Sequence, residues 1–314
     1  MRSYTLIAPA KINLYLEIIG DRDDGYHELA MILQSIQLAD QIEIESNDVQ
    51  LIRLRCDSSY IPVDRSNLAY RAADLMVSEF PDSFATYGGV DITLHKRIPV
   101  AAGLAGGSTD AAAVLVGIDL LWKLGLTRSE LEELAAKLGS DIPFCIGGGT
   151  AIATGRGEKL SELLGLSNTY IVLAKYRSLE VSTPWAYKAY RSLYSDTYIK
   201  DTENLVDRKN AVHSGEIVKA ISNQDASQVA QKMHNDLEKV VLPEYSQVLK
   251  LKESFAKYDI LGTMMSGSGP SVFALCDSKD KAEQVKINLR NEIPDPDLEL
   301  FVTKLINHGI QVIS

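Results

Sequence analysis

Cysteine is scarce in this sequence, whose 314 residues include only Cys56, Cys145 and Cys276. The three lie far apart and are odd in number, which excludes a disulfide framework and the usual zinc patterns and suits a reducing compartment. Basic residues are also outnumbered, with 32 Lys and Arg against 42 Asp and Glu, a net charge of -10. This balance argues against a general nucleic-acid binder and against a membrane-surface protein, although it permits a local basic pocket.

Long apolar runs are missing as well. The longest stretch without a charge, Ile260–Cys276, contains three glycines and a proline, so it cannot form a regular membrane helix. Near the N-terminus, Lys11 and Glu17 interrupt the apolar residues, and no secretory signal is visible. The contents of 46% hydrophobic and 24% charged residues are those of an ordinary globular protein. We therefore expect a cytoplasmic protein.

Two common nucleotide-binding motifs are absent from the Gly-rich segment Pro99–Ala111. It has no lysine after Gly107, as a Walker A motif requires, and the spacing of Gly103 and Gly106 does not fit a dinucleotide fingerprint. Its glycines and hydroxyls nevertheless stand before a helical segment, an arrangement in which backbone N–H groups bind phosphate. The segment is either a phosphate loop of another kind or a tight turn without a ligand.

Apolar periodicity predicts a mixed α+β protein. A composition shift between residues 155 and 180 suggests two domains, an ATP-binding and catalytic domain at 1–160 and a substrate-side domain at 161–314. The expected strands are Tyr4–Ile19, bent at Pro9, then Ile32–Leu38, Gln41–Glu45, Leu51–Arg55, Val90–His95, Thr150–Thr154, Tyr170–Ala174, Ser271–Cys276 and two short strands at the end. The expected helices are Asn67–Phe80, Ala111–Leu124, Arg128–Leu138, Pro184–Tyr194, Ser214–Ser222, Ala226–Val241, Glu244–Tyr258 and Lys279–Arg290.

Three segments together indicate a family. The early Ala8–Leu14, the Gly-rich Pro99–Ala113 and the late Ser266–Ala274 resemble, in order and spacing, the three motifs of the galactokinase, homoserine kinase, mevalonate kinase and phosphomevalonate kinase superfamily. The resemblance spans nearly the whole chain. It implies a two-domain small-molecule kinase fold with ATP and substrate held in the cleft between the domains.

Further segments narrow the resemblance. Gly25–Leu29, Ser140–Phe144 and Gly155–Glu158 are similar to motifs of the superfamily branch that phosphorylates a cytidine-diphosphate-linked methylerythritol. The resemblance implies that ATP phosphorylates the 2-hydroxyl of this small molecule, giving the 2-phosphate and ADP, in the non-mevalonate isoprenoid pathway. It implies Mg²⁺ carried with the nucleotide. The ion is held either by protein side chains or only by the phosphates, and we assign no residue to it.

Two residues are candidates for the chemistry. From the residues alone, Asp141 is most simply a turn or cap residue and Lys11 a solvated lysine of a strand. The resemblance instead makes Asp141 the group that faces the acceptor hydroxyl, either as a base or mainly to orient it. It makes Lys11 the cation beside that carboxylate.

The donor side is implied by the same resemblance. Ser108 and Thr109 either cap the following helix or reach a phosphate oxygen or magnesium, and both can hold at once. Lys96 either neutralises phosphate or lines the adenine pocket. The expected ATP-binding residues are Asn67, Leu68, Lys96, Pro99, Val100, Ala101, Ala102, Gly103, Leu104, Ala105, Gly106, Gly107, Ser108 and Thr109.

The acceptor side has five candidates, again by resemblance. Tyr26 is expected to stack on cytosine and His27 to hydrogen-bond its edge, while Asn13 contacts the cytosine or the diphosphate. A second aromatic completes the stack, with Tyr187 the expected residue and Trp185 its rival, and Lys188 lies beside the diphosphate.

Two alternatives remain open at this stage. One is a kinase of the same superfamily acting on homoserine, mevalonate or a sugar, in which the pair Tyr26 and His27 would have no use. The other is a nucleotide-binding regulatory protein that has lost catalysis, which the presence of Lys11 and Asp141 argues against.

Overall fold

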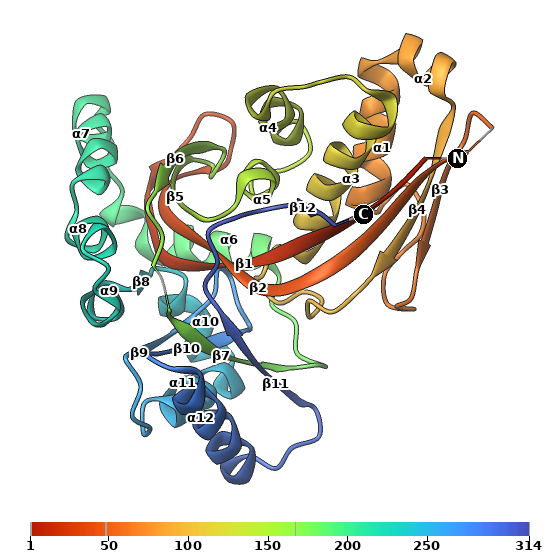
Figure 1. Cartoon of the computed structure of the whole chain (residues 1–314). Coiled ribbons are helices and arrows are strands. Elements are labelled where there is room, and N and C mark those ends of the chain that lie inside the picture. Colours follow the sequence, from red (N-terminus) through yellow and green to blue (C-terminus); the bar gives the residue numbers. More distant parts are fainter. Residues whose placement is uncertain (1, 48, 167, 314) are drawn as a thin grey trace.

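A computed structural model describes residues 2–47, 49–166 and 168–313 (Figure 1). The fold is built on an eight-stranded sheet with the order β12-β1-β2-β4-β3, in which β5 also pairs with β2, β6 with β5, and β8 with β1. These strands are β1 (Ser3–Asp21), β2 (His27–Asn47), β3 (Ile52–Cys56), β4 (Gly89–His95), β5 (Thr150–Gly155), β6 (Lys159–Leu163), β8 (His234–Asn235) and β12 (Gln311–Val312).

The centre of the sheet is the long antiparallel hairpin of β1 and β2. Its register shifts at three places, one of them between Pro9 and Lys11, where a bend was predicted. The prediction of β1 is confirmed. The prediction of two separate strands, Ile32–Leu38 and Gln41–Glu45, was wrong. They form one strand, β2, because pairing with β1 continues on both sides of the register shift near Pro9 and keeps the backbone extended.

Helices cover one side of this sheet. The helices in the first half of the chain are α1 (Leu68–Glu79), α2 (Pro81–Tyr87), α3 (Gly106–Trp122), α4 (Arg128–Ala136) and α5 (Ile142–Gly147). In Figure 1, α3 lies beside α1 and packs on β1 and β2, while α1 also contacts β3. The small residues of α3 permit its close approach to the sheet, since a Cβ added at Gly117 would lie 2.7 Å from the Ile44 side chain.

A second, four-stranded sheet has the order β11-β7-β10-β9. It lies at the lower end of Figure 1 with α11 and α12 against it. Its strands are β7 (Tyr170–Tyr176), β9 (Gly262–Met265), β10 (Val272–Cys276) and β11 (Leu298–Lys304). The remaining helical elements are α6 (Thr183–Tyr194), η1 (Ser195–Thr197), α7 (Thr202–His213), α8 (Glu216–Ser222), α9 (Ala226–Lys232), α10 (Glu238–Glu244), α11 (Ser246–Phe255) and α12 (Lys279–Glu292).

The two sheets share a core. One buried cluster joins Leu16 and Leu33 of the first sheet to Val172 and Ala274 of the second. The last strand, β12, returns to pair with β1. A division of the chain at residue 160 stays a prediction.

One predicted helix was wrong. The segment Ala226–Val241 is interrupted after Lys232, and His234 and Asn235 pair in parallel with Tyr15 and Leu16 of β1. The helical spacing of apolar residues continues through this segment, but the backbone there makes hydrogen bonds to a strand more than 200 residues away. A second helix then begins at Glu238.

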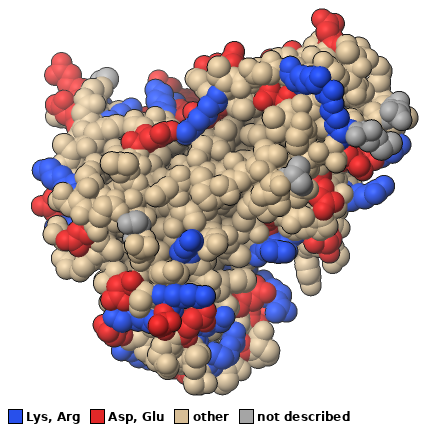
Figure 2. All heavy atoms as spheres, in the orientation of Figure 1, with Lys and Arg blue, Asp and Glu red and all other residues tan. Residues whose placement is uncertain are grey.

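Charges of both signs are spread over the surface. On the face shown in Figure 2, Lys and Arg side chains lie among Asp and Glu side chains rather than in one basic patch. Among the helices in the described ranges, none combines the length and apolar character needed to span a bilayer.

Candidate functional site

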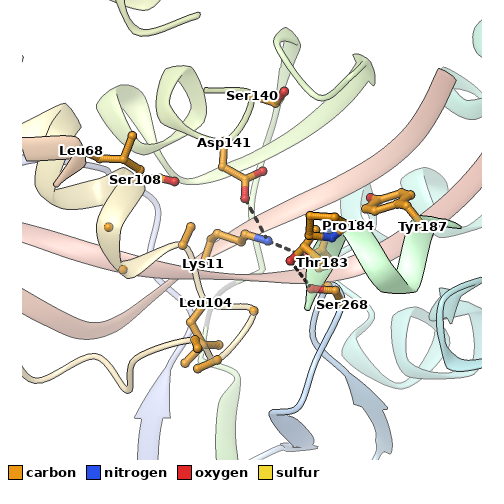
Figure 3. A pocket seen from close by; sticks show the side chains of 18 of the residues that line it. Lys11, Leu68, Leu104, Ser108, Ser140, Asp141, Thr183, Pro184, Tyr187 and Ser268 are labelled. Atoms are coloured by element: carbon orange, nitrogen blue, oxygen red, sulfur yellow. Dashed lines mark hydrogen bonds and ion pairs between the residues drawn. The ribbon is translucent and has the colours of Figure 1, made fainter. Parts of the chain in front are cut away.

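All but one of the predicted site residues come together in one cavity of about 1070 Å³. In the view of Figure 3, Lys11 and Asp141 lie between Leu68 and Ser108 on one side and Pro184 and Tyr187 on the other. The predicted residues that line it are Lys11, Asn13, Tyr26, His27, Asn67, Leu68, Lys96, Pro99, Val100, Ala101, Ala102, Gly103, Leu104, Ala105, Gly106, Gly107, Ser108, Asp141, Tyr187 and Lys188.

The Gly-rich loop is held from two sides. The Lys11 N–H donates to the Leu104 carbonyl at 3.1 Å, and the Ser266 hydroxyl donates to the Gly103 carbonyl at 3.1 Å. Gly103 has φ +72°, and a Cβ there would lie 2.3 Å from the Ser266 carbonyl oxygen. Only glycine fits this contact. The three sequence motifs therefore meet at the loop.

The loop leads directly into α3, which begins earlier than predicted. Its N-cap is Ala105 in the left-handed conformation, and no side chain caps the helix. The prediction that Ser108 or Thr109 caps it was therefore wrong, because both lie inside the first turn. The first-turn N–H groups of a helix have no partner within the helix and attract anions. Here they begin at the cavity wall formed by Gly106, Gly107 and Ser108.

Lys11 and Asp141 face each other within the cavity. The Lys11 ammonium lies 3.6 Å from an Asp141 carboxylate oxygen and donates to Asn13 Oδ1 at 2.8 Å (Figure 3). Lys11 is buried, whereas about a third of the Asp141 side chain is exposed. Asp141 occupies the N-cap position of α5 but makes no side-chain capping bond. Its carboxylate is thus directed to Lys11 and the cavity, not to its own helix.

Aromatic side chains form the opposite part of the wall. Tyr187 lines the cavity, and its ring centroid is 5.2 Å from that of His27. Trp185, the rival candidate, instead packs edge-on against Tyr245 and does not line the cavity. Tyr26 is 56% exposed at the cavity rim. The structure thus brings Tyr26, His27 and Tyr187 to one end of the cavity, together with Lys188.

His27 is neutral at physiological pH. Its burial, assisted by the nearby Arg191 cation, lowers its pKa to about 4. Its Nε2 atom is buried without a hydrogen-bond partner in the described structure, and the carboxylate of Asp21 is 3.8 Å away. A neutral imidazole can donate or accept one hydrogen bond, which suits a polar ligand edge.

Lys96 has two carboxylate partners. Its ammonium contacts Asp40 and lies 2.6 Å from Asp110, and all three side chains are buried. The remaining Asp40 oxygen accepts from the Arg97 and Ile98 N–H groups. Lys96 lines the cavity, with its charge balanced by these two carboxylates. Its role toward phosphate or adenine stays a prediction. The group of Asp40, Lys96 and Asp110 carries an excess negative charge when fully ionised.

The position of Asp110 disfavours the ionised form of its carboxyl group. Burial, opposed by Lys96 and reinforced by Asp40, raises the pKa of its carboxyl to about 7. Its Oδ1 atom is buried and has no partner in the described structure.

This raised pKa makes the stability depend on pH. Unfolded aspartate titrates near 4, so between about pH 4 and pH 7 the unfolded chain gives up the proton that the folded protein keeps. The contribution of Asp110 to the free energy of unfolding should fall over this range. We expect the difference between wild type and Asp110→Asn, measured by urea denaturation at several pH values, to decline and then level off. A difference that stays constant with pH would contradict this.

Thr109 is the one predicted site residue outside the cavity. It lies in the first turn of α3, and its side chain is fully buried in the core and does not line the cavity. Residues that the sequence reasoning did not assign also line the cavity: Gly25, Ile61, Pro62, Asp110, Ser140, Arg156, Thr183, Pro184, Arg191, Gly267 and Ser268. Arg156 lies in a segment that carried the resemblance, but nothing in the sequence directs Arg191 to the cavity.

Metal ligands are few in this cavity. No cluster of three or more His, Cys, Asp or Glu suited to a metal occurs in the described ranges. Ser108 offers a hydroxyl oxygen at the loop, a ligand of the hard type that magnesium accepts.

Comparison with known proteins gives a consistent result. The family description "GHMP kinases N terminal domain" matches residues 67–149, and "GHMP kinases C terminal" matches residues 217–295. The chain is 69% identical to 4-diphosphocytidyl-2-C-methyl-D-erythritol kinase of Trichormus variabilis, covering 100% of this chain and 99% of the relative. It is 57% identical to the protein of the same name from Synechocystis, with both chains covered fully.

Solved structures resemble it as well. A crystal structure of 4-(cytidine 5'-diphospho)-2C-methyl-D-erythritol kinase superposes with a TM-score of 0.73 at 30% identity, covering 97% of this chain and 100% of the other. A homoserine kinase from Cytophaga hutchinsonii gives the same TM-score at 18% identity, covering 100% and 98%. The second likeness concerns the fold alone.

Proposed function

This chain belongs to the GHMP kinase family, and we propose that it transfers the γ-phosphoryl group of ATP to the 2-hydroxyl of 4-diphosphocytidyl-2-C-methyl-D-erythritol. The products are the 2-phosphate and ADP, and the step belongs to the non-mevalonate route to isoprenoid precursors. The supporting observation is that one cavity joins a phosphate loop, a lysine–aspartate pair and an aromatic end.

The donor binds at the loop side. The triphosphate lies against the glycines of Gly103–Gly107 and the uncapped start of α3, where N–H groups and the helix dipole favour negative charge. The adenosine part lies toward Leu68. Asn67 supports this wall, because its side chain accepts from Ala69 N at 2.8 Å and donates to the Pro62 carbonyl at 2.7 Å.

Magnesium would accompany the nucleotide. The ion supplies charge neutralisation on the β- and γ-phosphates in phosphoryl transfer. Its ligands would be phosphate oxygens, and the Ser108 hydroxyl is the loop side chain of suitable chemistry.

The transfer takes place at Lys11 and Asp141. The acceptor hydroxyl oxygen forms a bond to the γ-phosphorus as the bond to the β-phosphate oxygen breaks, and ADP leaves. Asp141 holds the hydroxyl in line and receives its proton, early if it acts as a base and late if it mainly orients. Lys11, 3.6 Å from Asp141, keeps this carboxylate in place and stabilises the developing charge.

The acceptor binds at the aromatic end. The cytosine stacks between Tyr26 and Tyr187, and the neutral His27 hydrogen-bonds its edge. Lys188 and Asn13 lie where they can contact the diphosphate or the base. Cytoplasmic location and the division into domains at residue 160 are part of this proposal.

A substrate panel tests the function. Purified protein is incubated with ATP, magnesium and, in separate reactions, 4-diphosphocytidyl-2-C-methyl-D-erythritol, homoserine, mevalonate and galactose, and ADP release is measured. We expect turnover of the cytidyl substrate only. Preferred turnover of another acceptor would refute the substrate assignment, and no turnover of any would support a regulatory protein.

A further inference from the structure

The turn between β1 and β2 carries Tyr26, and its backbone is well anchored. The Arg22 N–H donates to the Tyr26 carbonyl at 3.0 Å, and the Asp24 carboxylate accepts from the Tyr26 N–H at 3.1 Å. Arg191 of α6 donates to the Gly25 carbonyl at 2.9 Å and to Asp21 at 2.8 Å. The position of the turn is therefore set independently of the Tyr26 ring.

Few contacts hold the Tyr26 ring itself. More than half of the Tyr26 side chain is exposed, so packing does not fix its orientation. The aromatic contact found for it in the described structure is Arg156, whose guanidinium carbon lies 5.0 Å from the ring centroid. A cation over an aromatic face at this distance is attracted by the ring quadrupole.

Arg156 is well placed to act as a support. It follows β5 in the short connection to β6, and its N–H donates to Glu158 Oε2 at 2.7 Å. The preceding Gly155 N–H donates to Glu28 Oε1 of β2 at 3.0 Å. This connection is thus tied to the strand that begins at His27. Arg156 lies over one face of the Tyr26 ring, and both residues line the cavity.

We propose that Arg156 is a positioning residue that holds the Tyr26 ring in the orientation for stacking on the cytosine of the acceptor. The inference rests on the proposed function, because it assigns Tyr26 to the base. Without Arg156 the ring would rotate freely about its side-chain torsions, and binding of the base would have to restrict this motion. Arg156 thereby contributes to acceptor affinity through Tyr26.

The substitution Arg156→Gln keeps a polar amide, shortens the side chain and removes its charge. We expect the Kd for cytidine diphosphate, measured by calorimetry, and the KM for the cytidyl substrate to rise about two- to fivefold. The kcat at saturating substrate and the KM for ATP should stay close to wild type. Arg156→Lys should recover part of the loss. As a matched control, Arg177→Gln removes the same charge at an exposed site outside the cavity and should leave the Kd unchanged.

A double-mutant cycle separates positioning from direct contact with the substrate. Tyr26→Ala alone should raise the Kd for cytidine diphosphate about five- to 150-fold, the range for one stacked base. If Arg156 acts through Tyr26, Arg156→Gln adds nothing in the Tyr26→Ala background. Equal losses in both backgrounds would mean that Arg156 contacts the diphosphate, and the inference would be overturned.

The two proposals fail in different ways. Wild-type protein that binds no cytidine diphosphate and does not turn over the cytidyl substrate would refute the proposed function. Wild-type protein that binds it, together with an Arg156→Gln variant of equal affinity, would refute the positioning role alone.

Discussion

Asp141→Asn should lower kcat for the cytidyl substrate by about 10²- to 10⁴-fold, the range for losing one positioned acid–base group. Asparagine has the same size but cannot accept the hydroxyl proton, and it removes the charge partner of Lys11. Affinities for ATP and for cytidine diphosphate should be retained, because Asp141 lies between Ser108, on the proposed donor side, and Tyr187, on the proposed acceptor side (Figure 3). The measurements are steady-state kinetics and calorimetric binding.

The size of this fall also distinguishes the two roles of Asp141. Asparagine can still orient a hydroxyl, so a fall near the lower end of the range favours orientation and one near the upper end favours a base. Asp280→Asn, in the exposed first turn of α12, is the matched control and should have wild-type kinetics. An unchanged kcat in Asp141→Asn would remove this residue from the chemistry. A selective loss of ATP affinity would place it in the donor site instead.

Lys96→Met should lower the free energy of unfolding by about 3–5 kcal/mol, the usual cost of removing one partner from a buried ion pair. The two carboxylates of Asp40 and Asp110 would then be buried without a counter-charge. The loss should be smaller at acid pH, where protonation removes the repulsion. Chemical denaturation of both proteins at neutral and acid pH measures it.

Two variants test the cause of this loss. Lys137→Met removes a lysine from an exposed pair with Glu79 and should cost less than about 1 kcal/mol. Adding Asp110→Asn to Lys96→Met removes one of the stranded carboxylates and should restore part of the stability. A Lys96→Met protein as stable as wild type at neutral pH would show that the group of Asp40, Lys96 and Asp110 is not held as an ion cluster.

Local signals predicted much of the fold correctly. The helix α4 begins at the capping box of Thr127 and Glu130, and Asn67 caps α1. These features depend on residues two or three positions apart, which a sequence displays directly. The failures lie where distant strands take over, as at His234, which pairs with β1 instead of continuing a helix.

The site, too, has features that a local pattern predicted and features that depend on distant contacts. The glycines of the loop suggested a phosphate site, and the resemblance of the three motifs to a known superfamily implied a kinase. The resemblance favoured Tyr187 over its rival Trp185, but the structure was needed to show which side of α6 faces the cavity, where Tyr187 lines the wall and Trp185 does not. Arg191 was missed for the same reason.

By itself, the sequence determined the class of this protein, its family motifs and the residues Lys11 and Asp141 on which the transfer is proposed to depend. Only the tertiary structure decided which distant side chains the site residues contact. Lys96 contacts Asp40, which lies 56 positions earlier in the sequence. Arg156 and Tyr26, which also contact each other, lie in the turns of two different hairpins. Such contacts arise from strand register and helix packing, which sum weak interactions over the whole chain. No local pattern encodes them, and they place Lys96 in a buried ion cluster.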